Sequence, residues 1–213
     1  MALSKVNFNS MNVTPAASKA IKFNSSNNGL ETGDIGGNLV LLSTVTASSS
    51  ANISFTSGID STYKEYIFKF IDIHASSADK HFQVNFRDGG SSYDATKTTA
   101  YVKVRHGEDD SLGSLGYDDG NDLAQSTGAQ KLHENSHTDN DSCLAGTLHL
   151  FDPSNTTFVK HFISNCNSVA NPPISDNILV AGYCNVTAAI DGVQFSFSSG
   201  NIDSGTIKMY GVL

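Results

Sequence analysis

The sequence predicts an all-β protein, an antiparallel β-sandwich of the jelly-roll type with an extended N-terminal arm. Val, Ile, Thr, Phe and Tyr fill the apolar runs, and these residues suit the half-buried, pleated surface of a strand. Gly, Asn, Asp and Ser cluster between the runs, where turns need them. About ten short runs follow residue 38, the pattern of a sandwich or barrel. Long excursions between the runs favour a jelly roll over an up-and-down barrel.

Residues 1–38 are predicted to form an N-terminal attachment arm. This segment has few apolar residues and no sustained period, and Pro15 and several glycines interrupt it. A segment with so little apolar surface cannot order itself alone, so we expect it to lie extended on a neighbouring protein. Its apolar contacts would be Val6, Phe8 and Phe23.

Residues 39–213 are predicted to form the sandwich body. Its first strands are expected in the runs 39–47, 51–57, 63–75, 81–87 and 98–106. The run 63–75 is the clearest, because charges interleave with a buried side made of Tyr66, Phe68, Phe70 and Ile73. In the next run, Phe82, Val84 and Phe86 share one face at a period of two.

Residues 106–142 interrupt this pattern. They are acidic and rich in glycine, and they predict a long loop that is functional or mobile. Strands are expected to resume with the runs 143–151, 158–166 and 178–188. The segment 192–212 is predicted to be a β-hairpin, with Val193, Phe195 and Phe197 on one face.

The charge balance excludes several classes of partner. A net charge of −8 argues against nucleic acid and against anionic lipid, which both require clustered Lys and Arg. The N-terminal residues lack the apolar stretch of a signal peptide, and no run of 18 apolar residues predicts membrane insertion. We therefore expect a protein made in the cytoplasm, with a polar, weakly charged surface that suits sugars or other proteins.

Two groups of residues in or near the acidic loop are candidate binding sites. Asp118, Asp119 and Asp122 offer the hard oxygen ligands that Ca²⁺ prefers, although the spacing of an EF-hand is missing. The alternative is a solvated acidic loop without any cofactor. Near loop boundaries, Tyr93, Tyr101 and Tyr117 could stack on a sugar and so bind a receptor. The alternative is that Tyr93 and Tyr101 cover the edge of the sandwich.

No pattern in the sequence predicts an enzyme. Residues 133–137, HENSH, match the zinc-peptidase string HExxH, but that motif needs a helix to align its two imidazoles. Asn135 and Ser136 are poor helix formers, and no apolar stripe supports the segment. No GxSxG nucleophile elbow is present in the sequence. We expect the protein not to be catalytic.

Three segments resemble virion proteins of marine podoviruses, including phages of cyanobacteria. The opening MALSKVNFNSM resembles the start of tail-fibre and related virion proteins. Residues 17–74, from ASKAIKF to FIDIH, and residues 192–212, GVQFSFSSGNIDSGTIKMYGV, resemble a β-rich module of those proteins. The middle of the chain shows no such match, and the shared motifs are structural rather than catalytic.

This resemblance implies a component of a phage particle, located in the virion and typically homotrimeric. A short N-terminal part would attach to other virion proteins, and the β-sandwich head would point outward. The chain has no long stalk, which favours a compact fibre tip or adhesin that recognises a glycan or protein of the host surface. The alternatives are a capsid or tail decoration protein that stabilises the particle and, less favoured, a polysaccharide depolymerase.

Overall fold

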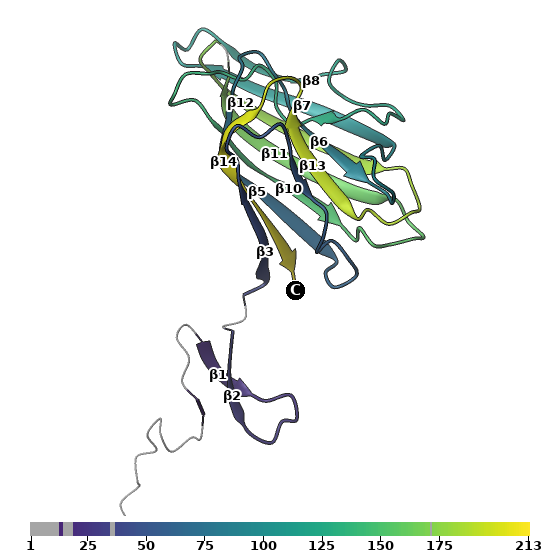
Figure 1. The fold of residues 1–213 in the computed structure, drawn as a ribbon. Coiled ribbons are helices and arrows are strands. Elements are labelled where there is room, and N and C mark those ends of the chain that lie inside the picture. The colour runs from purple at the N-terminus through teal and green to yellow at the C-terminus, as the bar shows by residue number, and fades with distance from the viewer. Residues whose placement is uncertain (1–12, 15–18, 35–36, 171) are drawn as a thin grey trace, which may run out of the picture. The chain divides into compact units, whose positions relative to one another are not determined.

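The computed structural model describes residues 13–14, 19–34, 37–170 and 172–213, and every regular element in these ranges is a β-strand (Figure 1). The described chain divides into two compact units, residues 1–38 and 39–213. In the second unit, antiparallel sheets pack on each other, which confirms the predicted all-β sandwich. Whether the sandwich is a jelly roll stays a prediction.

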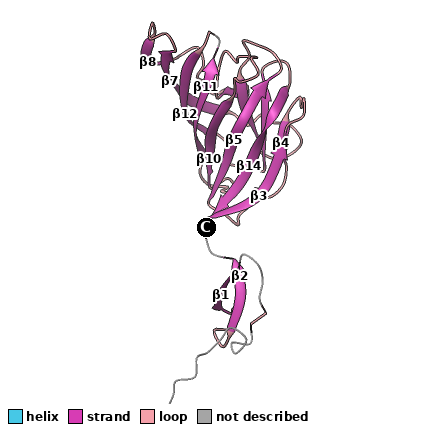
Figure 2. Cartoon of the chain, turned by 90° about the vertical axis from the view of Figure 1, so that its left-hand side faces the viewer, coloured by secondary structure: helices cyan, strands magenta, loops and turns pink. Residues whose placement is uncertain are grey.

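Two sheets make up the body, and all their strand pairs are antiparallel. The large sheet appears as one row of neighbouring strands in Figure 2. Its described strands are, in spatial order, β3 (Leu39–Thr46), β14 (Ile202–Val212), β5 (Glu65–Ala75), β10 (Leu144–Phe151), β11 (Lys160–Ala170), β12 (Ile174–Cys184), β7 (Lys97–Gly107) and β8 (Gly113–Tyr117). The small sheet contains β4 (Ile53–Phe55), β13 (Gly192–Phe197), β6 (Phe82–Arg87) and β9 (Gln130–Lys131).

The final hairpin predicted from the sequence is wrong. β13 pairs with β4 and β6 in the small sheet, whereas β14 pairs with β3 and β5 in the large sheet. The connection between them therefore crosses from one sheet to the other. Alternation correctly predicted which residues of β13 are buried, but it carries no information about which strand lies alongside.

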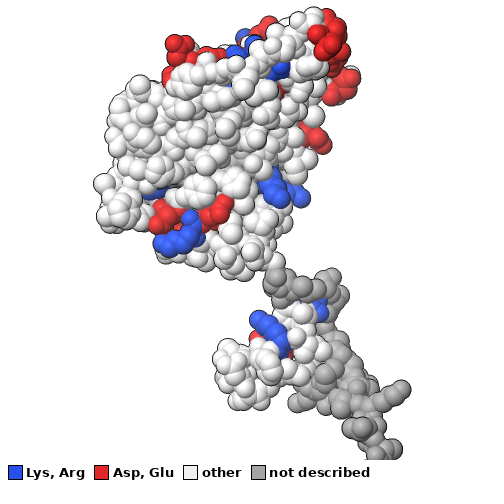
Figure 3. All heavy atoms as spheres, turned by 180° about the vertical axis from the view of Figure 1, so that it is seen from behind, with Lys and Arg blue, Asp and Glu red and all other residues white. Residues whose placement is uncertain are grey.

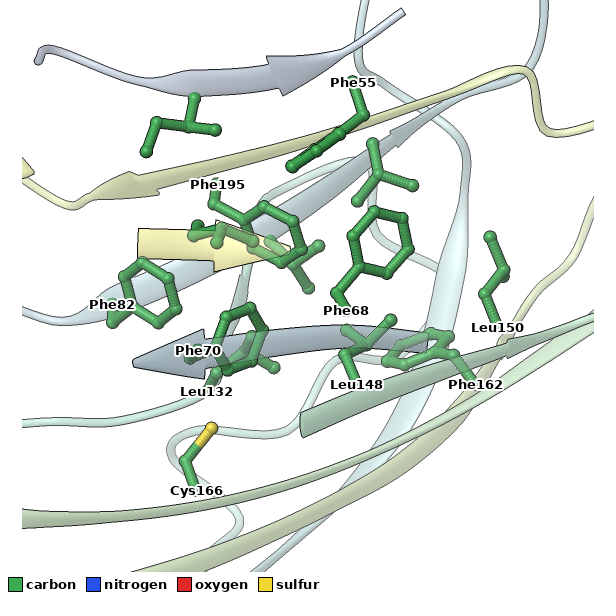
Figure 4. Close-up of a cluster of buried hydrophobic side chains, with 14 of the residues drawn as sticks. Phe55, Phe68, Phe70, Phe82, Leu132, Leu148, Leu150, Phe162, Cys166 and Phe195 are labelled. Carbon is green, nitrogen blue, oxygen red and sulfur yellow. The ribbon is translucent and has the colours of Figure 1, made fainter. Parts of the chain in front are cut away.

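The phenylalanines between the two sheets form the centre of the core (Figure 4). The ring of Phe195 in β13 lies 5.1 Å from that of Phe70 and 5.4 Å from that of Phe68, both in β5. A bulge lets β5 bury Phe70 and then Ile73, because Asp72 between them adopts a positive φ of 52°. The predicted buried side of this strand is confirmed.

Two lysines are buried on the inner face of the large sheet and have their ammonium groups satisfied. Lys97 Nζ donates hydrogen bonds to Asn85 Oδ1 at 2.5 Å and to the carbonyl of Ala95 at 2.7 Å. Lys160 Nζ donates to three backbone carbonyls. Burial lowers the pKa of Lys97 to about 8, because a charged amine loses its hydration there.

The first unit contains a hairpin, which the expectation of an extended arm did not include. β1 (Lys19–Phe23) pairs with β2 (Leu30–Asp34), and Lys22 and Glu31 form an ion pair at 3.5 Å. Phe23 ends β1 with a side chain that is 70% exposed. The other two predicted attachment residues, Val6 and Phe8, lie outside the described residues. The role of this unit in attachment stays a prediction.

Candidate recognition site at the β8 edge

The segment predicted as one long acidic loop is largely ordered structure. It contains β8 and β9. Residues 118–142, here called the cover segment, first run along the edge of β7, where their backbone forms hydrogen bonds with that of Lys97, Thr99 and Tyr101, and then pass beneath its inner face. Asp118 N donates to the carbonyl of Tyr101, and Leu132 N donates to that of Phe82 in the small sheet, at 2.9 and 2.7 Å. Gln130, Leu132 and His133 are buried. The cover segment is therefore a wall of the sandwich rather than a free loop.

Cations of β7 anchor the cover segment through its acids. Lys103 Nζ donates to Asp118 at 2.7 Å and to Glu134 at 2.5 Å. Arg105 also bonds Glu134 and lies 3.3 Å from Asp176, which is fully buried in β12. We call these five residues the ionic cluster. Asn121 donates further hydrogen bonds to Asp118 and Glu134, at 3.0 and 2.6 Å.

The pKa shifts distinguish the acids of the ionic cluster. Burial favours a higher pKa for Glu134, but the bonds and charges of Lys103 and Arg105 outweigh it and the pKa is lowered. For Asp176, burial is the larger effect and the pKa is raised, despite the bond from Arg105. The hydrogen bond from Lys103 lowers the pKa of Asp118. Among these three acids, Glu134 is the one that contacts both Lys103 and Arg105.

The edge strand β8 presents an aromatic ring beside polar groups. Tyr117, 59% exposed, donates from its hydroxyl to the carboxylate of Asp122, and this bond raises the tyrosine pKa. A hollow of about 320 Å³ lies beside the ring and is also lined by Leu115, Lys103, Asp118 and Asp119. A flat ring next to hydrogen-bonding side chains can stack on one face of a sugar and bond its hydroxyl groups.

The three tyrosines predicted to bind a receptor do not form one platform. Tyr117 is exposed, but Tyr101 is fully buried in β7, so its prediction as a surface residue is wrong. Tyr117 pairs with Val102, the residue after Tyr101, and successive strand residues point to opposite faces. Tyr93 lies elsewhere, with the Arg87 guanidinium 5.9 Å from its ring centre.

The predicted calcium ligands have protein partners. Asp118 accepts hydrogen bonds from Lys103 and Asn121, and Asp122 accepts one from Tyr117. Among the described residues, no group of three or more His, Cys, Asp or Glu side chains is arranged to hold a metal ion. A cation at Asp118 would have to compete with the ammonium of Lys103. Calcium binding stays a prediction.

The HENSH residues have structural roles. His133 is 2% exposed, and burial lowers its pKa to about 3, so its imidazole is neutral in the folded protein. Neither of its ring nitrogens has a partner among the described residues. Glu134 belongs to the ionic cluster, and the segment is not helical. The string therefore does not create the paired imidazoles that zinc binding requires.

A second hollow, of about 450 Å³, lies at the bulge of β5. Asp72, His74, Cys143 and Asp203 line it, and His74 Nδ1 is 3.6 Å from Asp203 Oδ2. Sequence reasoning missed both this hollow and the ionic cluster. Neither could be found from local patterns, because each joins residues from distant segments.

Comparisons of the chain with protein-family models, with curated proteins and with solved structures found no match in any of the three. In the part of the chain that the structure describes, no helix is long and apolar enough to cross a membrane.

Proposed function

We propose that the chain is a non-catalytic structural protein of a phage particle, a homotrimeric tail-fibre or adhesin component whose sandwich head recognises a host-surface glycan or protein. The resemblance of residues 1–11, 17–74 and 192–212 to podovirus virion proteins supports the class. The N-terminal unit would attach to other virion proteins. The observation that carries the recognition role is the exposed ring of Tyr117 beside Asp122 and Lys103.

The recognition site can be tested without disturbing the sandwich. Tyr117 lies on the exposed edge strand β8, and Tyr117→Ala removes its ring. Tyr117→Phe keeps the ring and loses only the hydrogen bond to Asp122. Fluorescently labelled protein would be applied to intact cyanobacterial cells and to a panel of bacterial surface glycans. Stacking of an aromatic ring contributes on the order of 1 kcal/mol or more, so we expect Tyr117→Ala to weaken binding at least about fivefold.

A matched control is Phe158→Ala, because Phe158 is 69% exposed and lies in the loop between β10 and β11. This variant is expected to bind like the original protein. Unchanged binding by Tyr117→Ala would contradict the recognition role of the β8 edge. Deleting the whole predicted loop 106–142 is a poor test, since it would also remove the cover segment.

The alternative is a decoration protein that stabilises the capsid or tail. The broad uncharged surface described below supports it, because such a surface suits contacts between structural proteins. An antibody against the purified chain, located on intact virions by electron microscopy, separates the two. Label at fibre ends favours host recognition, and label over the capsid favours decoration.

A further inference from the structure

The outer face of the large sheet has an unusual distribution of charge. Every Lys, Arg and Asp of β7, β11 and β12 points inward, toward the small sheet and the cover segment: Lys97, Lys103, Arg105, Lys160 and Asp176. Residues between them point to the outer face, because side chains alternate along a strand. The outward residues of these three described strands, and those of β10, include no Asp, Glu, Lys or Arg.

Apolar, amide, hydroxyl and imidazole side chains occupy this face instead. Ile163 of β11 is 44% exposed, and Leu179 of β12 is 41% exposed. Between them, Asn165 pairs across the strands with Leu179 and accepts a hydrogen bond from Asn177 at 2.8 Å. One cross-strand row runs from β7 to β3 without Asp, Glu, Lys or Arg: Ala100, Ala181, Ile163, His149, Ile67, Tyr210 and Leu41. His149, at its centre, contacts Glu65 of β5, and its Nδ1 lies 2.6 Å from Glu65 Oε1.

An antiparallel sheet face that remains in water is normally polar, whereas the centre of a protein interface is depleted of charge. The charged residues that do lie on the outer face are on neighbouring strands β5 and β14: Glu65, Lys69, Asp72, Asp203 and Lys208. Seen from behind, the molecule presents a broad uncharged surface with its charged groups along the margins (Figure 3). This face therefore has the composition of a surface that is covered.

We infer that a second copy of this chain covers the outer face of the large sheet, with Ile163, Asn165 and Leu179 near the centre of the contact. Each copy carries a net charge of −8, so repulsion between two copies is weakest where the surfaces in contact carry no acidic residues. A strongly basic or acidic partner would require complementary charge, which β10, β11, β12 and β7 do not offer on this face. An uncharged face of this kind can pack on an uncharged surface of a neighbouring copy.

The uncharged part of the face has about the area of a stable contact. Five neighbouring strands, β10, β11, β12, β7 and β8, carry no charged outward residue, and the central ones have 11 residues. With a strand spacing of about 4.8 Å and a rise of about 3.3 Å per residue, this part measures at most roughly 24 by 36 Å, or about 860 Å². A standard interface requires about 800 Å² from each partner. β8 lies at one edge of this sheet, so Tyr117 would be at the periphery of the contact.

This inference rests on the proposed function only for the number of copies. The self-association surface is defined by the sheet, and the recognition site is defined by Tyr117. The two can therefore fail separately, because assembly is measured by mass and recognition by binding to cells.

The test is the mass of the full chain in solution, measured by light scattering during size-exclusion chromatography. The original protein is expected to have a mass that is a multiple of 22.6 kDa, and Ile163→Lys and Leu179→Glu are expected to reduce it to one copy. Phe158→Lys introduces the same charge at an exposed apolar residue outside the sheet and should leave the multimer intact. Circular dichroism would verify that each variant is folded.

If Ile163→Lys or Leu179→Glu fails to fold, the mass of an Asn165→Asp variant is measured instead. This substitution places a charge at the centre of the contact with almost no change in shape, so the variant is expected to be monomeric. The inference would be overturned if the original protein stayed monomeric at concentrations up to about 100 μM. A multimer that all three variants leave intact would overturn it as well, while leaving a trimer formed through another surface in place.

Discussion

The inner face of the large sheet is closed in two ways. Beneath β5 and β11, the small sheet supplies phenylalanine rings, such as Phe195 against Phe70 and Phe86 against Phe162. Beneath β7 and β12, the cover segment supplies carboxylates that meet Lys103 and Arg105. The first half depends on packed volume and the second on balanced charge, so different changes should weaken each.

The largest effect is expected in the aromatic half. Phe195→Ala removes a fully buried ring whose centroid lies within 6.3 Å of those of Phe55, Phe68, Phe70 and Phe82. The free energy of unfolding should fall by about 3–5 kcal/mol, because the variant loses apolar burial and leaves a cavity. Urea titration followed by circular dichroism measures this loss. A loss below about 1 kcal/mol would show that the rings do not form a continuous core.

A change in the ionic half should cost somewhat less. Glu134→Gln keeps the shape of the side chain but leaves Lys103 and Arg105 without their shared carboxylate. Breaking a buried ion pair by removing one partner costs about 3 kcal/mol, and exposed ion pairs contribute about 1 kcal/mol or less. Lys64→Ala is the matched comparison, since its pair with Asp152 is largely exposed. Equal losses from both variants would contradict the structural role of the cluster.

The cover segment should also make stability depend on pH through His133. The ordinary pKa of 6.5 applies in the unfolded chain, and burial lowers the pKa to about 3 in the folded protein. Between these values only the unfolded chain binds the proton, so the free energy of unfolding falls as pH decreases, by about 1.4 kcal/mol per pH unit. His133→Asn should remove this part of the slope, and His106→Asn, at an exposed histidine, should not. Identical slopes in all three proteins would contradict a neutral, buried His133.

The smallest effect is expected at alkaline pH from Lys97. Its pKa is lowered from 10.5 to about 8 by burial, so between these values the unfolded chain binds the additional proton. The free energy of unfolding should therefore rise with pH in this window. In a Lys97→Met variant this rise should disappear, which thermal unfolding at pH 8 and above would measure. A rise that persists in the variant would assign the effect to another group.

Alternation in the sequence predicted most of the strands and their buried faces, as Phe82, Val84 and Phe86 illustrate. It did not predict that β7 turns Lys103 and Arg105 inward, because valines occupy the alternate positions and would suit a core equally well. The acids that stabilise the inward cations come from β12 and the cover segment. Local patterns contain no record of such distant partners, which also explains why Tyr101 was misplaced.

Residues 118–142 form a wall of the sandwich, and hydrogen–deuterium exchange of the native protein, followed by mass spectrometry, tests this directly. Amides near Leu132 and Ser136 donate to the carbonyls of Phe82 and Lys80, and they are expected to exchange as slowly as those of β6. If the whole segment exchanged within seconds, residues 118–142 would be a free surface loop and not a wall of the sandwich.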